Sequence, residues 1–121
     1  MHWKHMLLAL LVGVLIISGL STPIAQAQDA PKRIEITARQ STFEPAEITL
    51  KKGQPTVIVL KSVDVAHGLR IRELNVEVKV AKGGTAEVQF TPDKTGDFVG
   101  HCIVFCGPGH GSMALKVHVV D

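Results

Sequence analysis

The sequence has few aromatic residues. It contains no Tyr, its one Trp is Trp3, and Phe occurs four times in 121 residues. Proteins that hold bases or sugars stack them on aromatic side chains, and this scarcity argues against a stacking platform. All four Phe residues lie between positions 43 and 105, well beyond the N-terminal segment.

The sequence also lacks an excess of charge of one sign. Its formal net charge is +2, and without Lys4 in the N-terminal segment twelve Lys and Arg face eleven Asp and Glu. Proteins that bind nucleic acid present clustered Lys and Arg to the phosphates, so we predict no nucleic-acid partner. Hydrophobic residues make up 45% and charged residues 20% of the chain, which is typical of a globular domain and not of a disordered one.

One long apolar run is present, near the N-terminus. It covers residues 7–20, follows a short basic start, and precedes a small-residue site at 25–27. These three parts are typical of a secretory signal, so we expect a signal helix within residues 1–27 and cleavage after Ala27. As a helix the run would span only about 21 Å, less than the roughly 30 Å of a hydrocarbon core. An uncleaved membrane anchor is the alternative.

Both alternatives export the rest of the chain. We therefore expect a periplasmic or extracellular location, with membrane attachment only if residues 1–27 stay in place. In an oxidising compartment Cys102 and Cys106 could pair as a disulfide unless something else holds them. The remaining residues, 28–121, suffice for one small domain and leave no room for a separate catalytic domain.

Residues 28–121 are expected to form an all-β domain. Short runs rich in Val, Ile and Thr alternate with Gly, Pro, Asn and Asp, and no stretch has a sustained helical period. Eight short strands in this length predict a sandwich or barrel. The expected strands cover residues 33–38, 47–50, 56–61, 68–72, 76–80, 85–90, 97–101 and 113–120.

Two of these strands carry further information. Alternation in 113–120 points His118 away from the core, toward water. The apolar run 57–60 is continuous, which predicts a central strand covered on both faces. This strand leads the chain into the loop that contains His67.

The chemically informative residues are concentrated in segment 102–113. Two thiols, an imidazole and a thioether follow the pattern CxxxCxxxHxxM, formed by Cys102, Cys106, His110 and Met113. This soft and borderline ligand set favours copper, whereas a thioether is a poor ligand for zinc. Three glycines and a proline between the ligands let the backbone turn tightly. We predict a copper site, with zinc as the weaker candidate.

A further ligand has to come from outside this segment. His67 is the best candidate, because it follows a buried strand and directly precedes Gly68. The structural alternatives are a disulfide between the two cysteines, core packing for Met113 and an ordinary loop position for His67. A disulfide would leave the spacing of His110 and Met113 unexplained.

The motif resembles that of a known domain family. The run Asp64-Val65-Ala66-His67-Gly68 is followed by segment 102–113, called the cysteine segment below, with Gly107 after the second thiol. Together they resemble the binuclear copper A domain. This cupredoxin domain occurs in cytochrome c oxidase subunit II and in nitrous oxide reductase. The Phe43-Glu44-Pro45 pattern also resembles the start of many cupredoxins. The resemblance covers most of residues 32–121 and implies a Greek-key β-sandwich or barrel.

The resemblance also implies a role for each site residue. Cys102 and Cys106 would bridge two coppers, and His67 and His110 would each bind one of them. Met113 would be a weak axial ligand to one copper, and the backbone carbonyl of Val104 would face the other. The function implied is single-electron transfer with a cytochrome or an oxidase as redox partner. No nucleophile and base, phosphate loop or carboxylate dyad indicates an enzyme.

Two other functions remain open at this point. A mononuclear blue-copper site would use the same ligands with Cys102 as a bystander. A periplasmic copper carrier or chaperone would bind Cu(I) and pass it to an oxidase during assembly. The sequence leaves open the number of coppers, the redox partners, the oligomeric state and the role of His101, which alternation points away from the neighbouring thiol.

Overall fold

Nine strands and two 3₁₀ helices make up the chain from Lys32 to Val120 in the computed structural model, which describes residues 19–21 and 30–121. Apart from residues 19–21, the expected signal helix lies outside the described residues. None of the helices in the described ranges is long and apolar enough to cross a membrane. The elements are β1 (Lys32–Arg39), β2 (Thr42–Glu44), β3 (Glu47–Lys51), β4 (Thr56–Ser62), β5 (His67–Ile71), η1 (Arg72–Leu74), β6 (Val76–Val80), β7 (Thr85–Phe90), β8 (Gly96–His101), η2 (His110–Ser112) and β9 (Ala114–Val120).

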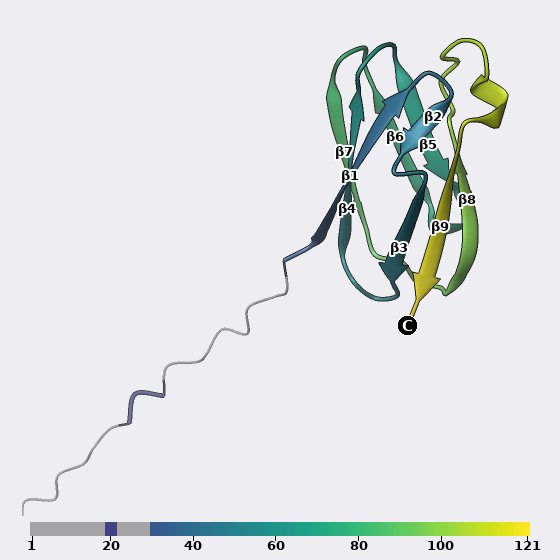
Figure 1. Ribbon diagram of the computed structural model, residues 1–121. Coiled ribbons are helices and arrows are strands. Elements are labelled where there is room, and N and C mark those ends of the chain that lie inside the picture. The colour runs from purple at the N-terminus through teal and green to yellow at the C-terminus, as the bar shows by residue number, and fades with distance from the viewer. Residues whose placement is uncertain (1–18, 22–29) are drawn as a thin grey trace, which may run out of the picture.

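The strands form two sheets that face each other (Figure 1). One sheet has the order β2-β1-β4-β7, and the other has the order β3-β9-β8-β5-β6. Two of the pairings, β1 with β4 and β3 with β9, are parallel, and the others are antiparallel. The parallel pairs place strands side by side that are separated by other strands in the sequence. The prediction of an all-β sandwich is confirmed.

All eight predicted strands are present, with small differences at their ends. The strand predicted over 68–72 starts at His67 and ends at Ile71, because Arg72 enters η1. The last strand starts at Ala114 and not at 113, because Met113 forms the C-terminal cap of η2. Strand β2 was not predicted, since its three residues are too few to show an alternation.

The core fills the space between the two sheets. Strand β4 lies between β1 and β7, and all four residues of the apolar run 57–60 are buried, as predicted for a central strand. Alternate residues of the neighbouring strands point inward to complete the core. Its fully buried side chains include Ile36, Phe43, Leu50, Ile58, Leu60, Leu69, Ile71, Leu115 and Val117.

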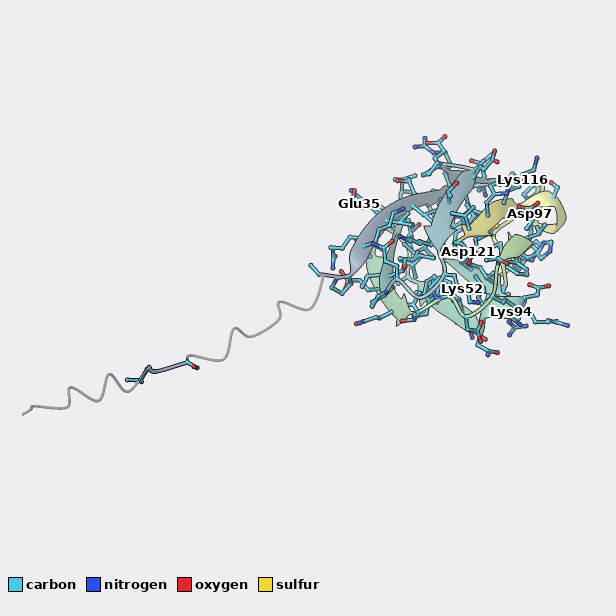
Figure 2. The ribbon with its side chains drawn as sticks, turned by 90° about the horizontal axis from the view of Figure 1, so that it is seen from below. Glu35, Lys52, Lys94, Asp97, Lys116 and Asp121 are labelled. Carbon is cyan, nitrogen blue, oxygen red and sulfur yellow. The ribbon has the colours of Figure 1, made fainter. Side chains whose placement is uncertain are left out.

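The C-terminus and the segment between β8 and β9 lie at opposite ends of the barrel (Figure 1). Figure 2 looks onto the end where the C-terminus lies, and Lys52, Lys94 and Asp121 are exposed there. The segment between β8 and β9, which contains the CxxxCxxxHxxM pattern, lies at the opposite end (Figure 1). The predicted metal-binding residues of this segment are therefore gathered at the end of the barrel that lies away from the C-terminus (Figure 1).

His118 joins three strands on the outer face of the five-stranded sheet. Its side chain is 32% exposed, so it reaches water as expected, but two carboxylates partly cover it. Its Nδ1 atom contacts Asp97 on β8, and its Nε2 atom contacts Glu47 on β3. The hydrogen bonds to Asp97 and Glu47 raise the pKa of His118 above its ordinary value.

The two contacts of His118 with Asp97 and Glu47 predict that the stability of the copper-free protein depends on pH. Because folding raises the pKa of His118, its stabilising contribution is complete below about pH 6.5, the ordinary pKa of histidine, and is lost as the pH rises through the folded-state pKa. We expect the free energy of unfolding of the wild type, relative to His118→Gln, to decrease over this interval. Urea denaturation at a series of pH values measures the difference. Parallel pH profiles for the two proteins would contradict the prediction.

Candidate metal centre

Two buried thiols lie at the centre of the site. Cys102 is 7% exposed and Cys106 is 5% exposed. Their Sγ atoms are 4.0 Å apart, about twice the length of a disulfide bond, and both cysteines are free. The alternative of a disulfide is therefore not realised in this structure. The two sulfurs instead lie close enough to share a ligand.

Cys106 contacts two other predicted ligands of segment 102–113. Its Sγ atom lies 3.5 Å from Nδ1 of His110 and 3.7 Å from Sδ of Met113. Helix η2 begins at His110 and is capped at Met113. A 3₁₀ helix has three residues per turn, so residues three apart lie on the same side, and both side chains reach the same thiol.

Cys102 has a neighbour of its own. Its thiol donates a hydrogen bond to the backbone carbonyl of Val104 at 3.3 Å. The backbone N–H of Cys102 donates to the carbonyl of Met113 at 3.3 Å, which continues the ladder between β8 and β9 into the segment. This hydrogen bond joins the two ends of segment 102–113. The predicted donor atoms at 102, 104, 106, 110 and 113 therefore lie close together.

His67 brings the remaining predicted ligand from β5. One nitrogen of its ring and the sulfurs of Cys102 and Cys106 lie within 4.8 Å of one another. His67 is fully buried, its Nε2 atom contacts Oδ1 of Asp64 at 2.6 Å, and its Nδ1 atom has no hydrogen-bond partner. Among the described residues this is the one buried side-chain nitrogen or oxygen without a partner. A buried polar atom without a partner is unfavourable, and a metal ion would satisfy it.

Gly68 lets the two parts of the site approach each other. A Cβ atom at this position would lie 2.6 Å from Cγ1 of Ile103 and 3.1 Å from Cγ2 of Val104. The first distance is shorter than carbon atoms approach, so a side chain at Gly68 would force Ile103 to shift and would crowd Val104. The glycine therefore allows residues 102–106 to lie against the strand that carries His67.

Asp64 orients His67. The carboxylate accepts hydrogen bonds from the backbone N–H of Val65 at 2.6 Å and of Gln40 at 2.7 Å, besides its contact with His67. Burial raises the pKa of Asp64, but the hydrogen bonds from His67, Val65 and Gln40 outweigh it and lower the pKa to about 2. Asp64 lies in the loop between β4 and β5, and it is an ionised partner that fixes the imidazole ring. Such partners orient metal-binding histidines.

The chemistry of the donor set fits copper. Burial raises the pKa of Cys106, and the neighbouring Cys102 raises it further, so without a metal ion the Cys106 thiol keeps its proton at neutral pH. A bound metal ion reverses this balance, because a coordinating thiol loses its proton. Two sulfurs, two imidazoles and a thioether are soft or borderline ligands, which favour copper.

Two neighbours of the cysteines lie at the surface. Phe105 is 79% exposed, and its ring is tilted by 53° against that of His110, with 5.5 Å between the ring centroids. This residue therefore covers His110 and contributes nothing to the core. His101 is exposed on the outer face of β8, pointing away from the thiols as alternation predicted.

Comparison with known proteins places the chain in a family. The cupredoxin-like domain matches residues 7–113, most of the sequence. The chain belongs to the cupredoxin-like family. The predicted cupredoxin-like fold is thereby confirmed.

Two cupredoxin-like relatives carry the names expected from the motif. The chain is 33% identical over 90 residues to nitrous-oxide reductase of Cupriavidus necator, which covers 71% of this chain and 14% of that protein. It is 31% identical over 71 residues to cytochrome c oxidase subunit 2 of Thermus thermophilus, which covers 59% of this chain and 53% of that protein. The chain thus spans only part of these relatives, and the predicted resemblance to both is confirmed.

A solved structure agrees with the sequence comparison. A chain of a heme-copper terminal oxidase dimer, determined by cryo-electron microscopy, has a TM-score of 0.67 and 30% sequence identity. The match covers 78% of this chain and 68% of that chain. The similarity therefore includes both sequence and structure over the larger part of the domain.

Proposed function

We propose that this cupredoxin-like chain is an exported electron-transfer protein with a binuclear copper A-type site. The Sγ atoms of Cys102 and Cys106, shared between the two ions, would hold the copper together with the imidazoles of His67 and His110 and Sδ of Met113. The backbone carbonyl of Val104 would complete this donor set. Bound copper supplies the chemistry, which is the uptake and release of single electrons.

The position of Cys102 is the observation that carries this proposal. If Cys102 were a bystander to a mononuclear site, nothing would require it to face the ligands. Its sulfur is instead buried 4.0 Å from that of Cys106 and has a separate acceptor, the carbonyl of Val104. Cys106 has its own neighbours, His110 and Met113. Two sulfurs with different partners support one copper on each side of the pair.

The residues of the chain hold the site in one geometry. The cysteine segment is closed by the hydrogen bond from Cys102 to the carbonyl of Met113, and His67 is fixed between β5 and Asp64. Burial of both thiols, of His67 and of Met113 excludes water from these four side chains, and His110 is half-buried. Electron transfer is fast where the ligands move little between redox states, and a buried site on a rigid β scaffold meets this requirement.

A redox protein is the expected partner, and we propose a cytochrome or an oxidase. The exposed ring of Phe105 lies against His110, so an apolar contact at this end of the barrel would bring a partner next to a ligand. The relative named cytochrome c oxidase subunit 2 supports this class of partner. Mutual burial of apolar surface stabilises such contacts.

Copper stoichiometry with electron paramagnetic resonance tests the proposed function. We expect anaerobic reconstitution of the copper-free protein to yield two coppers per chain and hyperfine structure from two equivalent nuclei that share one unpaired electron. One copper with a single-nucleus spectrum would support the mononuclear blue-copper site instead. Binding restricted to Cu(I), with release to an acceptor, would support a copper carrier.

Export is part of the same proposal. Residues 1–27 are proposed as a signal peptide, and residues 28–121 as the copper-binding domain. We expect the exported protein to begin at Gln28, because the small-residue site at 25–27 stands where a signal peptidase cleaves. Intact-mass spectrometry of the secreted protein measures the N-terminus. A mass that includes residues 1–27 would favour the uncleaved anchor.

A further inference from the structure

The turn between β1 and β2 contacts both parts of the candidate metal centre. It consists of Gln40 and Ser41. The backbone N–H of Gln40 donates to Oδ2 of Asp64 at 2.7 Å, and Oδ1 of the same carboxylate contacts His67. The side-chain Nε2 of Gln40 donates to the backbone carbonyl of Cys106 at 3.1 Å. Gln40 therefore contacts Asp64, which is the partner of His67, and also the backbone of Cys106.

Ser41 extends this contact along the cysteine segment. Its hydroxyl donates to the carbonyl of Pro108 at 2.5 Å. A Cβ atom at Gly107 would lie 2.6 Å from Nε2 of Gln40, and one at Gly109 would lie 2.1 Å from Oγ of Ser41. The turn can approach the segment this closely only because both positions lack a side chain.

These contacts join the two sheets at the end of the barrel. Strands β1 and β2 belong to the four-stranded sheet, whereas His67 and the ends of the cysteine segment belong to the five-stranded sheet. The loop that precedes His67 is already joined to the four-stranded sheet, because it continues from β4 and Val63 donates a backbone hydrogen bond to Ala38 of β1. The hydrogen bonds of Gln40 connect His67 and Cys106 to a common point on this sheet.

We propose that Gln40 is a positioning residue of the metal centre, which holds His67 and Cys106 at the spacing that copper requires. The inference rests on the proposed function and adds a residue outside the ligand motif. The side-chain amide of Gln40 holds the backbone of Cys106. The backbone N–H of Gln40 holds Asp64 and, through Asp64, the imidazole of His67. Partners of metal ligands outside the coordination sphere change metal affinity by about 10- to 100-fold when they are removed.

The substitution Gln40→Met separates the two hydrogen bonds. Methionine is similar in length and cannot donate to the carbonyl of Cys106, while the backbone N–H that holds Asp64 remains. Gln40 is exposed, so the fold should tolerate the change. Gln89→Met is the matched control, because Gln89 is an exposed residue of β7 away from the site.

Copper binding and spectroscopy provide the first readout. We expect Gln40→Met to bind copper about 10-fold more weakly and to change the hyperfine splitting and the thiolate-to-copper absorption. Gln89→Met should match the wild type in all three measurements. A loss of global stability alone would leave the spectrum of the bound copper unchanged. Wild-type affinity and spectra in Gln40→Met would overturn the inference.

Thiol reactivity in the copper-free protein provides a second readout that does not depend on copper. We expect iodoacetamide to alkylate Cys106 severalfold faster in Gln40→Met than in Gln89→Met, because the segment that buries the thiol has lost a contact. Equal rates would overturn the inference. If the wild type bound no copper, the proposed function would fail, and the alkylation rates would still decide whether Gln40 positions Cys106.

Discussion

Cys102→Ser is expected to reduce the copper content from the proposed two ions per chain to one. A serine hydroxyl does not lose its proton to bridge two coppers as a thiolate does, so the second copper has no shared ligand. The remaining copper keeps Cys106, His110 and Met113, which contact one another in this structure. The paramagnetic spectrum should change from that of two equivalent nuclei to that of one.

The fold should survive this substitution. The thiol of Cys102 donates to the carbonyl of Val104, and a serine hydroxyl can donate to the same oxygen. Cys106→Ser is the matched comparison, with the same chemical change at the thiol that contacts both His110 and Met113. We expect this variant to lose both coppers. Unchanged copper stoichiometry in Cys102→Ser would refute the bridging role.

His67→Ala is expected to weaken copper binding by more than roughly 100-fold. Loss of a partner outside the coordination sphere costs up to this factor, and His67→Ala removes a proposed ligand itself. His67 is the one predicted ligand outside segment 102–113, and its Nδ1 atom lacks any other partner. Competition with a chelator of known affinity measures the loss. Circular dichroism of the copper-free variant should remain that of the wild type.

A matched control separates the loss of a ligand from the loss of packing. Leu69→Ala creates a cavity in the same strand, at a fully buried position, and should lower the free energy of unfolding by about 2–5 kcal/mol. We expect Leu69→Ala to keep near-wild-type copper affinity. Equal losses of affinity in the two variants would show that His67 acts through packing and not as a ligand.

Strands with clear alternation or a continuous apolar run were predictable, and short irregular elements were not. The central strand β4 was predicted from the run 57–60, and all four of its apolar residues are buried. Strand β2 and both 3₁₀ helices have three residues each, too few for any period to be visible. These short elements also explain why two predicted strand ends were shifted.

Neighbouring residues of the site were more difficult to predict than its candidate ligands. The function of Asp64 had one available signal, its position three residues before His67, because a loop can fold such a carboxylate onto the ring. The exposure of Phe105 could not be predicted, since an apolar residue beside a buried thiol is equally compatible with the core. Gln40 and Ser41 carry no signal in the sequence.

The sequence by itself determined the fold class and the set of candidate donor atoms, because strand periodicity and ligand spacing are local patterns. Only the tertiary structure decided that the two cysteines are free and that Cys102 faces the cluster. It also showed that the turn between β1 and β2 contacts the candidate site from the other sheet. The hydrogen bonds of this turn join residues 24, 66 and 67 positions apart, and contacts at such separations arise only when the sheets pack.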